Sequence, residues 1–145
     1  MSRFAQGKFA LKNPQKYVGG KSPTYRSSWE FAFMKMCDEN TAITKWASEA
    51  ISIPYRNPLS GKMTIYVPDF FIVYTDKTGK QQVELIEVKP KNHTFQESVG
   101  NSRYNKLHFV VNQAKWGAAR AWCKQKGIVF RVINEGDIFH QGKRR

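Results

Sequence analysis

Residues 63–89 decide the fold, and they read MTIYVPDFFIVYTDKTGKQQVELIEVK. Two runs rich in β-branched and aromatic residues, 63–74 and 82–89, flank the polar segment 75–80, which contains Gly79. Strand-forming runs on either side of a short polar segment with a glycine are typical of a β-hairpin. We therefore predict two antiparallel strands joined by a turn.

The register of this hairpin brings three ionisable side chains together. If the turn is centred on Thr78, Asp69 lies directly opposite Glu87, and the alternation of side chains puts Lys89 on the same face. Two opposed carboxylates on an otherwise apolar face repel each other, and a divalent cation removes the conflict. We predict that Asp69 and Glu87 bind Mg²⁺, with Mn²⁺ as the alternative ion. Lys89 would be a catalytic residue that orients or deprotonates a water and stabilises charge on the attacked phosphate.

The same residues have a simpler interpretation. Asp69 can end a turn after Pro68, while Glu87 and Lys89 form an ordinary exposed pair. A slip of one residue in the register would turn the two carboxylates to opposite faces. Both interpretations stay open on the sequence.

A helix is expected upstream of the hairpin, beginning near Ser27 and ending near Asn40. Its apolar residues recur at i, i+4, i+7 and i+8, the spacing of an amphipathic helix: Trp29, Phe33, Met36 and Cys37. Ser27 and Glu30 match a capping box, in which the glutamate bonds back to the first amide of the helix. Glu30 can equally supply a third carboxylate to the metal site. Glu49 borders the next strand, where we expect a solvated residue, with a role at the site as the alternative.

Residues 46–55 alternate like a strand, with a turn over 57–61. Residues 90–106 are polar and predict no regular element; we expect a loop beside the active site. A second helix is predicted over 112–126, and Gly127 stands where a left-handed C-cap residue belongs. One side of this helix is apolar: Ala114, Ala118, Ala121 and Trp122.

Residues 128–133 predict a last strand. The order helix, three strands, helix, strand predicts an α/β fold. The 145 residues are the size of one domain, with a basic extended arm over about 1–24 and a short basic tail over about 141–145.

The charge points to nucleic acid as a partner. Lys and Arg number 24 against 11 acidic residues, a net charge of +13, and such an excess attracts polyanions. On the second helix, Gln113, Lys115 and Arg120 are candidates for contacts with DNA. A basic protein without chemistry is the alternative. No apolar run is long enough to span a bilayer and no export leader is present, so we expect an intracellular protein without a membrane partner.

Pro68-Asp69 followed by Glu87-Val88-Lys89, behind a helix with Glu30, resembles the motif of the PD-(D/E)xK nuclease superfamily. Several longer segments together are similar to the head-completion proteins of contractile-tailed bacteriophages: YRSSWE (25–30), WASE (46–49), IPY (53–55), IEVKPK (86–91), KWGAA (115–119) and GIVFR (127–131).

This resemblance implies a restriction-endonuclease-like core, with a mixed central sheet flanked by helices. It implies a Mg²⁺ site on Asp69 and Glu87, an activating lysine at Lys89 and a contribution from Glu30. Arg26 and Lys91 lie in the similar segments and are further candidates for DNA contacts. The implied task follows genome packaging, with DNA and the portal, neck and tail-connector proteins as partners. The place would be the host cytoplasm during assembly, and then the head–tail neck of the virion.

Three hypotheses about function remain. The first is a metal-dependent DNA endonuclease, which the carboxylate pair and the adjacent lysine favour. The second is a structural neck protein that grips DNA or the portal without cleaving, which the basic ends favour. The third is a resolvase of branched DNA, which shares the chemistry of the first and differs in substrate.

Overall fold

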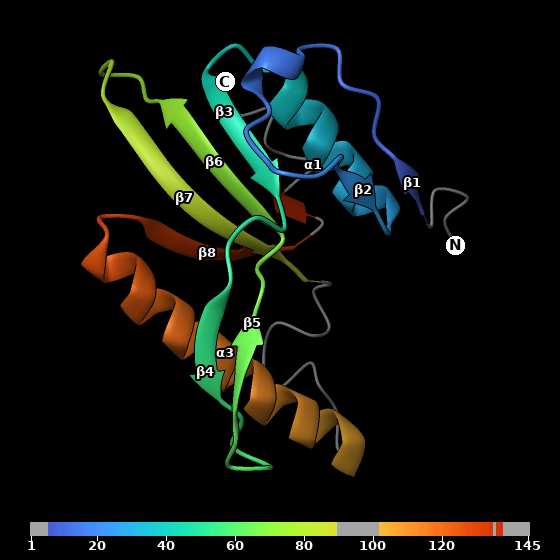
Figure 1. Ribbon diagram of the computed structural model, residues 1–145, viewed down its shortest axis with the longest axis vertical. Helices are drawn as coiled ribbons and strands as arrows, with labels where there is room; N and C mark the ends of the chain where they lie inside the picture. The colour runs from blue at the N-terminus through green and yellow to red at the C-terminus, as the bar shows by residue number, and fades with distance from the viewer. Residues whose placement is uncertain (1–5, 90–101, 135, 138–145) are drawn as a thin grey trace.

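The computed structural model describes residues 6–89, 102–134 and 136–137 (Figure 1). Their regular elements are, in chain order, β1 (Gly7–Lys8), η1 (Pro14–Lys16), β2 (Thr24–Tyr25), α1 (Ser28–Glu39), β3 (Ile43–Ser48), β4 (Ile53–Arg56), β5 (Met63–Tyr66), β6 (Phe70–Thr75), β7 (Gln81–Val88), α3 (Arg103–Gln125) and β8 (Val129–Ile133).

A four-stranded sheet in the order β3-β6-β7-β8 forms the centre of the fold. β3 and β7 both pair antiparallel to β6, whereas β8 pairs parallel to β7. The sheet is therefore mixed and lies between the two helices, which confirms the predicted α/β class. β4 and β5 form a separate two-stranded ribbon beside α3 (Figure 1).

The predicted register of the β6–β7 hairpin is confirmed. Phe70 pairs with Ile86 and Phe71 with Leu85, as expected for a turn centred on Thr78. Asp69 directly precedes this ladder and Glu87 directly follows its first pair, so the two acidic residues meet where the paired part of β6 begins.

The two faces of the sheet pack against different helices. Phe70, Ile72 and Ile86 point toward α1 and form one buried cluster with its apolar residues. Leu85, of opposite parity, packs with α3 and the β4–β5 ribbon in a second cluster. Because Glu87 shares the parity of Leu85, its side chain lies on the α3 face.

Two predicted strands are each divided. The strand expected over 46–55 ends at Ser48 and resumes as β4, because Glu49 adopts a left-handed backbone with φ 50°. The strand expected over 63–74 is interrupted between β5 and β6, where Pro68 is buried and lacks the N–H that a central strand needs. Each run thus contributes to both the central sheet and the ribbon.

Helix α3 begins at Arg103 rather than at residue 112. Ser102 caps it, since its hydroxyl accepts a hydrogen bond from the Asn105 N–H at 2.9 Å. The early turns have no buried stripe, because Tyr104 and Val110 are exposed, so hydrophobic periodicity does not reveal them. Ala121, predicted on the apolar side, is also exposed.

The end of α3 agrees with the sequence. Gly127 has φ 71°, and the Ile128 N–H donates to the Cys123 carbonyl at 2.9 Å, which together close a Schellman motif.

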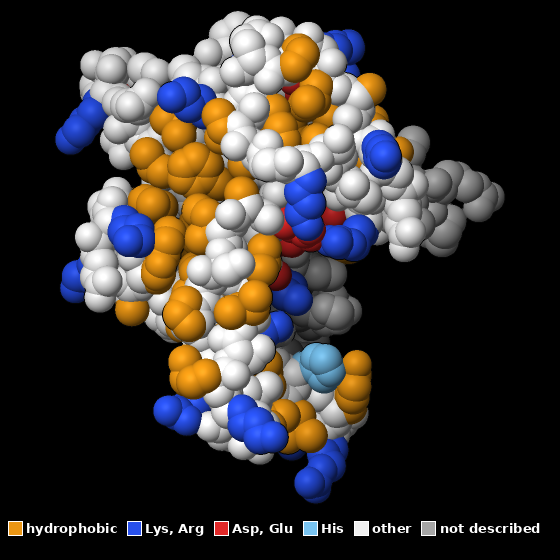
Figure 2. Space-filling view, in the orientation of Figure 1, with side chains coloured by type: hydrophobic (Ala, Val, Ile, Leu, Met, Phe, Trp, Pro, Cys, Tyr) orange, Lys and Arg blue, Asp and Glu red, His pale blue; other side chains and the backbone are white. Residues whose placement is uncertain are grey.

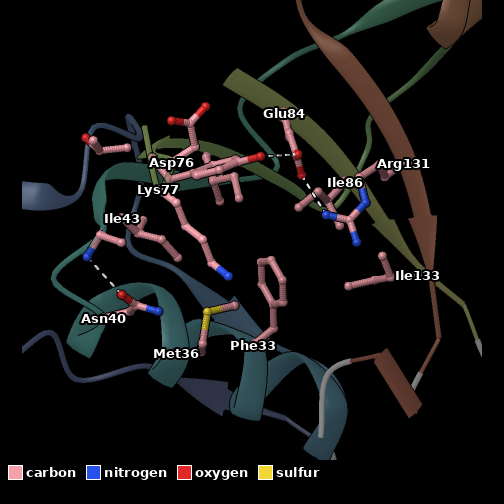
Figure 3. Close-up of a pocket in the computed structure, with 14 residues that line it drawn as sticks. Phe33, Met36, Asn40, Ile43, Asp76, Lys77, Glu84, Ile86, Arg131 and Ile133 are labelled. Carbon is pink, nitrogen blue, oxygen red and sulfur yellow. Dashed lines mark hydrogen bonds and ion pairs between the residues drawn. The ribbon is translucent and has the colours of Figure 1, made fainter. Parts of the chain in front are cut away.

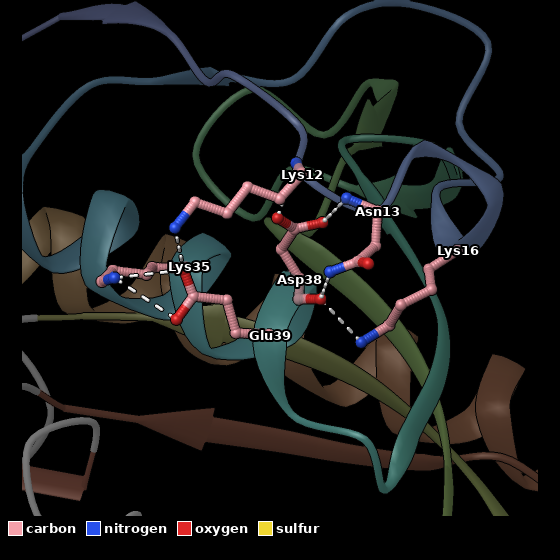
Figure 4. A network of polar contacts seen from close by, with 6 residues as sticks. All are labelled: Lys12, Asn13, Lys16, Lys35, Asp38 and Glu39. Atoms are coloured by element: carbon pink, nitrogen blue, oxygen red, sulfur yellow. Dashed lines mark hydrogen bonds and ion pairs between the residues drawn. The ribbon is translucent and has the colours of Figure 1, made fainter.

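The N-terminal segment, expected as an extended arm over about 1–24, packs against the body over its described residues. Phe9, Leu11 and Tyr17 contact the cluster around α1. The Asp38 carboxylate accepts hydrogen bonds from the backbone N–H groups of Lys12 (2.9 Å) and of the next residue (3.1 Å), as Figure 4 shows. The apolar side chains among the lysines explain the packing. The tail 141–145 and residues 90–101 lie outside the described residues.

Candidate active site

Glu87 is held at the end of the hairpin by its neighbours on the α3 side. It is buried, with 7% of its surface exposed. The Tyr66 hydroxyl, at the end of β5, donates a hydrogen bond to its Oε1 at 2.7 Å. Its Oε2 lies 3.7 Å from the Lys89 Nζ. The carboxylate is thus fixed at one oxygen, and its other oxygen faces the lysine that the sequence places on the same face.

Asp69 is held by the backbone on either side of it. Its Oδ2 accepts a hydrogen bond from the Val88 N–H at 2.8 Å, and its carbonyl accepts one from the Glu49 N–H at 2.9 Å. These contacts tie the start of β6 to the end of β7 and to the residue after β3. The Asp69 side chain is therefore positioned at the point where three strands of the sheet meet.

Burial raises the pKa of both carboxyl groups, and the charge of Glu87 raises the pKa of Asp69 further. The Tyr66 hydroxyl, then Lys89 and Lys115, act in the opposite direction on the pKa of Glu87. The two acids are therefore close enough to repel each other, and the basic groups around them do not fully compensate the pair.

These residues fit a hard divalent cation. Mg²⁺ takes oxygen ligands, often only one or two protein carboxylates together with several waters, and the acidic pair offers that donor set. In the described part of the chain, no three His, Cys, Asp or Glu side chains are arranged to hold a metal ion together. Asp69 and Glu87 are thus the candidate ligands, and the predicted metal-binding role of Glu30 stays a prediction.

Glu30 combines features of both roles expected for it. The Ser27 hydroxyl accepts from the Glu30 N–H at 3.1 Å, as an N-cap does. The Glu30 carboxylate bonds back to the N–H of Arg26 at 2.8 Å, one residue before the position that a capping box requires. Burial raises the pKa of Glu30, and its charge in turn raises the pKa of Asp69. Ser27 therefore caps α1, while the Glu30 carboxylate holds the segment before the helix and lies near the acidic pair.

Glu49 and Arg26 form an ion pair beside Glu30. The two terminal guanidinium nitrogens of Arg26 donate to the two carboxylate oxygens of Glu49, and the contact from Nη2 to Oε1 measures 3.3 Å. Glu49 is thus partly exposed but paired with Arg26, and it lies just after β3 rather than in a strand, so the expectation of a solvated strand residue is met only in part. Figure 2 shows acidic and basic side chains gathered at the junction between the upper and lower halves of the molecule.

The candidates on α3 separate into two groups. Lys115 lies near the site, because its Nζ is 5.7 Å from the centre of the Tyr66 ring and its charge acts on Glu87. Arg120 lies over the Phe130 ring at 6.0 Å, and Gln113 is exposed. Lys91 lies outside the described residues. Tyr66 is the site residue that the sequence did not indicate, since only the tertiary pairing of ribbon and sheet brings it to Glu87.

A second recess lies on the opposite face, toward the turn of the hairpin. It is a cavity of about 550 Å³ lined in part by Ile72 and Ile86; Figure 3 shows Ile86 together with Glu84 and Arg131. Its buried acid, Glu84, accepts hydrogen bonds from the Tyr74 hydroxyl at 2.8 Å and from Arg131 at 2.9 Å. This carboxylate therefore already has its counter-ion in Arg131.

Comparison with known proteins identifies the family of the chain. The family model described as "TnsA-like endonuclease N terminal" matches residues 40–135, which include Asp69, Glu87 and Lys89. The fold and this match define a nuclease with a restriction-endonuclease-like domain. Within the described residues, no helix has the length and hydrophobicity to cross a membrane.

The chain is also 35% identical over 142 residues to the "Head completion nuclease" of Enterobacteria phage T4, covering 91% of this chain and 92% of the phage protein. The chain belongs to the TnsA-like endonuclease family and, within it, to the phage head-completion nucleases.

Proposed function

We propose that this nuclease is a Mg²⁺-dependent DNA endonuclease of the PD-(D/E)xK class that hydrolyses phosphodiester bonds. One observation carries the proposal: Asp69 and Glu87 converge in a half-buried site, with the Lys89 ammonium 3.7 Å from the second carboxylate. The arrangement makes physical sense around a cation, since opposed buried carboxylates are otherwise unfavourable. Mn²⁺ has the same preference for oxygen ligands and is the alternative ion.

The residues of the chain have separate roles in this proposal. Asp69 and Glu87 hold the ion, and Tyr66 fixes the orientation of Glu87. When bound, Mg²⁺ supplies a Lewis acid that activates water and neutralises charge on the phosphate. Lys89 offers a positive charge and N–H donors to the attacked phosphate, where negative charge develops. Glu30 and Lys115 border the site and add one negative and one positive charge near it.

The biological setting follows from the relative. The phage T4 protein is named a head completion nuclease. We propose the same task here, with action on DNA after packaging, in the host cytoplasm during assembly and at the head–tail neck of the virion. Portal, neck and tail-connector proteins would be the protein partners. The net charge of +13 supports DNA as the ligand.

The proposal is tested by incubating the protein with linear duplex, branched and single-stranded DNA. Cleavage should require Mg²⁺, stop with chelator, and be lost in Asp69→Asn and Lys89→Ala. Preferred cleavage of branched DNA would identify a resolvase. If wild type binds DNA with a steep salt dependence yet cuts none of the substrates, the protein is a structural neck component and the enzymatic proposal is wrong. Cleavage that survives both substitutions would place the active site elsewhere.

A further inference from the structure

Glu49 has an unusual backbone for its residue type. Its φ of 50° lies in the left-handed region, and no other non-glycine residue among those described has a positive φ. Side chains with a Cβ are rarely found there, because the carbon crowds the backbone. A glycine at this position would avoid the strain. The chain instead carries a glutamate at the corner between β3 and the ribbon, one hydrogen bond away from Asp69.

This backbone conformation directs the carboxylate at Arg26. The two side chains form a two-point contact between guanidinium and carboxylate, the geometry that fixes the direction of an arginine as well as its position. The Arg26 side chain remains 56% exposed, while that of Glu49 is 26% exposed. The partly buried carboxylate of Glu49 therefore holds the Arg26 guanidinium at the protein surface.

The surroundings of Arg26 connect it to the active site. Its backbone N–H donates to the Glu30 carboxylate at 2.8 Å. The pKa of the guanidinium is raised mainly by Glu49, and also by Glu30 and Asp69. Arg26 thus places a positive charge near the acidic pair from the segment before α1, whereas Lys89 and Lys115 do so from the end of the hairpin and from α3.

Stability alone does not account for this arrangement. An ion pair with an exposed partner contributes little to folding, because water screens it and both side chains lose rotamer freedom. A left-handed backbone at a non-glycine residue costs at least as much. Strain of this kind is characteristic of positions where function requires one conformation.

We propose that Arg26 contacts a backbone phosphate of the DNA next to the scissile bond, and that Glu49 is the positioning residue that holds the guanidinium there. A guanidinium has five N–H donors, and the contact with Glu49 uses two of them. The remaining donors can reach a phosphate oxygen at the exposed side. This inference rests on the proposed function, which supplies DNA as the ligand and the acidic pair as the place of the scissile bond.

The test is DNA affinity as a function of salt, measured with a fluorescent duplex in chelator so that no cleavage occurs. Arg26→Ala should bind about 5–10-fold more weakly and lower the slope of log K against log salt by about one, as loss of one phosphate contact does. Arg26→Lys should keep most of the slope of log K against log salt, because lysine retains the positive charge. It should still bind DNA more weakly than wild type, because lysine lacks the two-point donor geometry of a guanidinium.

Glu49→Gln distinguishes a positioning role of Glu49 from a purely electrostatic one by whether DNA binding becomes weaker or stronger. Removing a negative charge beside a polyanion should strengthen binding if Glu49 acts only through its charge. A positioning role predicts weaker binding instead, and no additional loss in the double variant Arg26→Ala/Glu49→Gln. Glu39→Gln is the matched control, since Glu39 pairs with Lys35 and Lys12 on the surface; it should leave binding unchanged or slightly stronger. Glu49→Gly relieves the backbone and should fold with an equal or higher Tm, yet also bind more weakly.

Tighter binding by Glu49→Gln, or an unchanged salt slope in Arg26→Ala, would overturn the inference. Either result leaves the endonuclease proposal intact, because that proposal is judged by cleavage in the Asp69 and Lys89 variants. Absence of DNA binding by wild type would instead remove both.

Discussion

The β6–β7 hairpin carries two buried glutamates whose surroundings differ. Glu84 and Glu87 are 6% and 7% exposed, and each accepts a hydrogen bond from a tyrosine hydroxyl, from Tyr74 and Tyr66 respectively. Toward the turn, Arg131 lies 2.9 Å from Glu84 and supplies its counter-ion. At the other end, Glu87 lies near a second acid, Asp69. The Lys89 Nζ is 3.7 Å from the Glu87 Oε2.

The difference separates a structural carboxylate from a functional one. Burial of an ion is tolerable when a partner neutralises it at short range. Glu84 meets that condition within the described chain. Glu87 and Asp69 do not, and their raised pKa values express the same fact. We therefore propose that the acidic end of the hairpin takes up a cation from solution, whereas Glu84 at the other end already has Arg131 as its counter-ion.

The largest effect is expected on cleavage. Glu87→Gln should lower nuclease activity by about 10²–10³-fold, because it removes a proposed ligand of the proposed catalytic ion. Glu84→Gln changes the same residue type at the same depth and should keep activity within about twofold per folded molecule. Nicking of supercoiled plasmid measures both. Equal losses in the two variants would show that burial, rather than the acidic pair, matters.

The next effect is on the free energy of unfolding. Here the larger loss is expected at the Glu84 end of the hairpin, not at the Glu87 end. Arg131→Ala should lower the free energy of unfolding by about 2 kcal/mol, because Glu84 is left buried without its cation. Lys89→Ala should lower it by less than about 1 kcal/mol, since a longer contact with a part-exposed lysine contributes little. Urea denaturation of the metal-free proteins compares the two. A larger loss in Lys89→Ala would mean that the lysine neutralises Glu87 in the way Arg131 neutralises Glu84.

Removal of either tyrosine hydroxyl sharpens the comparison further. Tyr66→Phe should weaken Mn²⁺ binding by about tenfold, because the hydroxyl orients a proposed ligand. Tyr74→Phe removes an equivalent hydrogen bond and should cost about 1 kcal/mol of stability without changing ion affinity. Unchanged ion affinity in Tyr66→Phe would show that Glu87 needs no orienting partner.

The smallest effect is a dependence of stability on pH. Burial raises the folded-state pKa values of Asp69 and Glu87 above those of the unfolded chain, and the charge of Glu87 raises that of Asp69 further. The folded protein then binds protons at this pair more tightly, so the contribution of the pair to stability falls as pH rises through the folded values. In chelator, Asp69→Asn should exceed wild type in Tm by a few degrees at about pH 8 and by less at about pH 5. Addition of Mg²⁺ should reduce this difference in Tm at the higher pH. A difference in Tm between Asp69→Asn and wild type that grows toward low pH would contradict raised pKa values for the acidic pair.

The hairpin was predictable because its register depends on local information. The polar turn fixes the opposition of residues across the two strands, and the alternation of side chains then brings Asp69 to Glu87 and Lys89. Every pair recorded from Phe70 to Thr75 agrees with that register. The acidic site followed from the same geometry.

The breaks and cross-chain partners were not predictable in the same way. The run predicted over 63–74 overlooked Pro68, although a central strand rarely accommodates proline. Glu49 offered no comparable signal, because a glutamate is not expected at a positive φ. Tyr66 and Arg131 reach their glutamates only after strands distant in sequence come together, over 21 and 47 positions. Contacts of this kind depend on which strands lie next to each other in the fold. The hydrophobic periodicity of the sequence does not specify that arrangement.

Binding of a divalent cation tests the central claim most directly. Free Mn²⁺ can be followed by its electron paramagnetic resonance signal during titration with wild type, Glu87→Gln and Glu84→Gln, with Mg²⁺ as competitor. Wild type and Glu84→Gln should bind the ion with the same Kd and release it to Mg²⁺, while Glu87→Gln should bind at least about tenfold more weakly. Equal affinity in all three proteins, or none in wild type, would contradict the account.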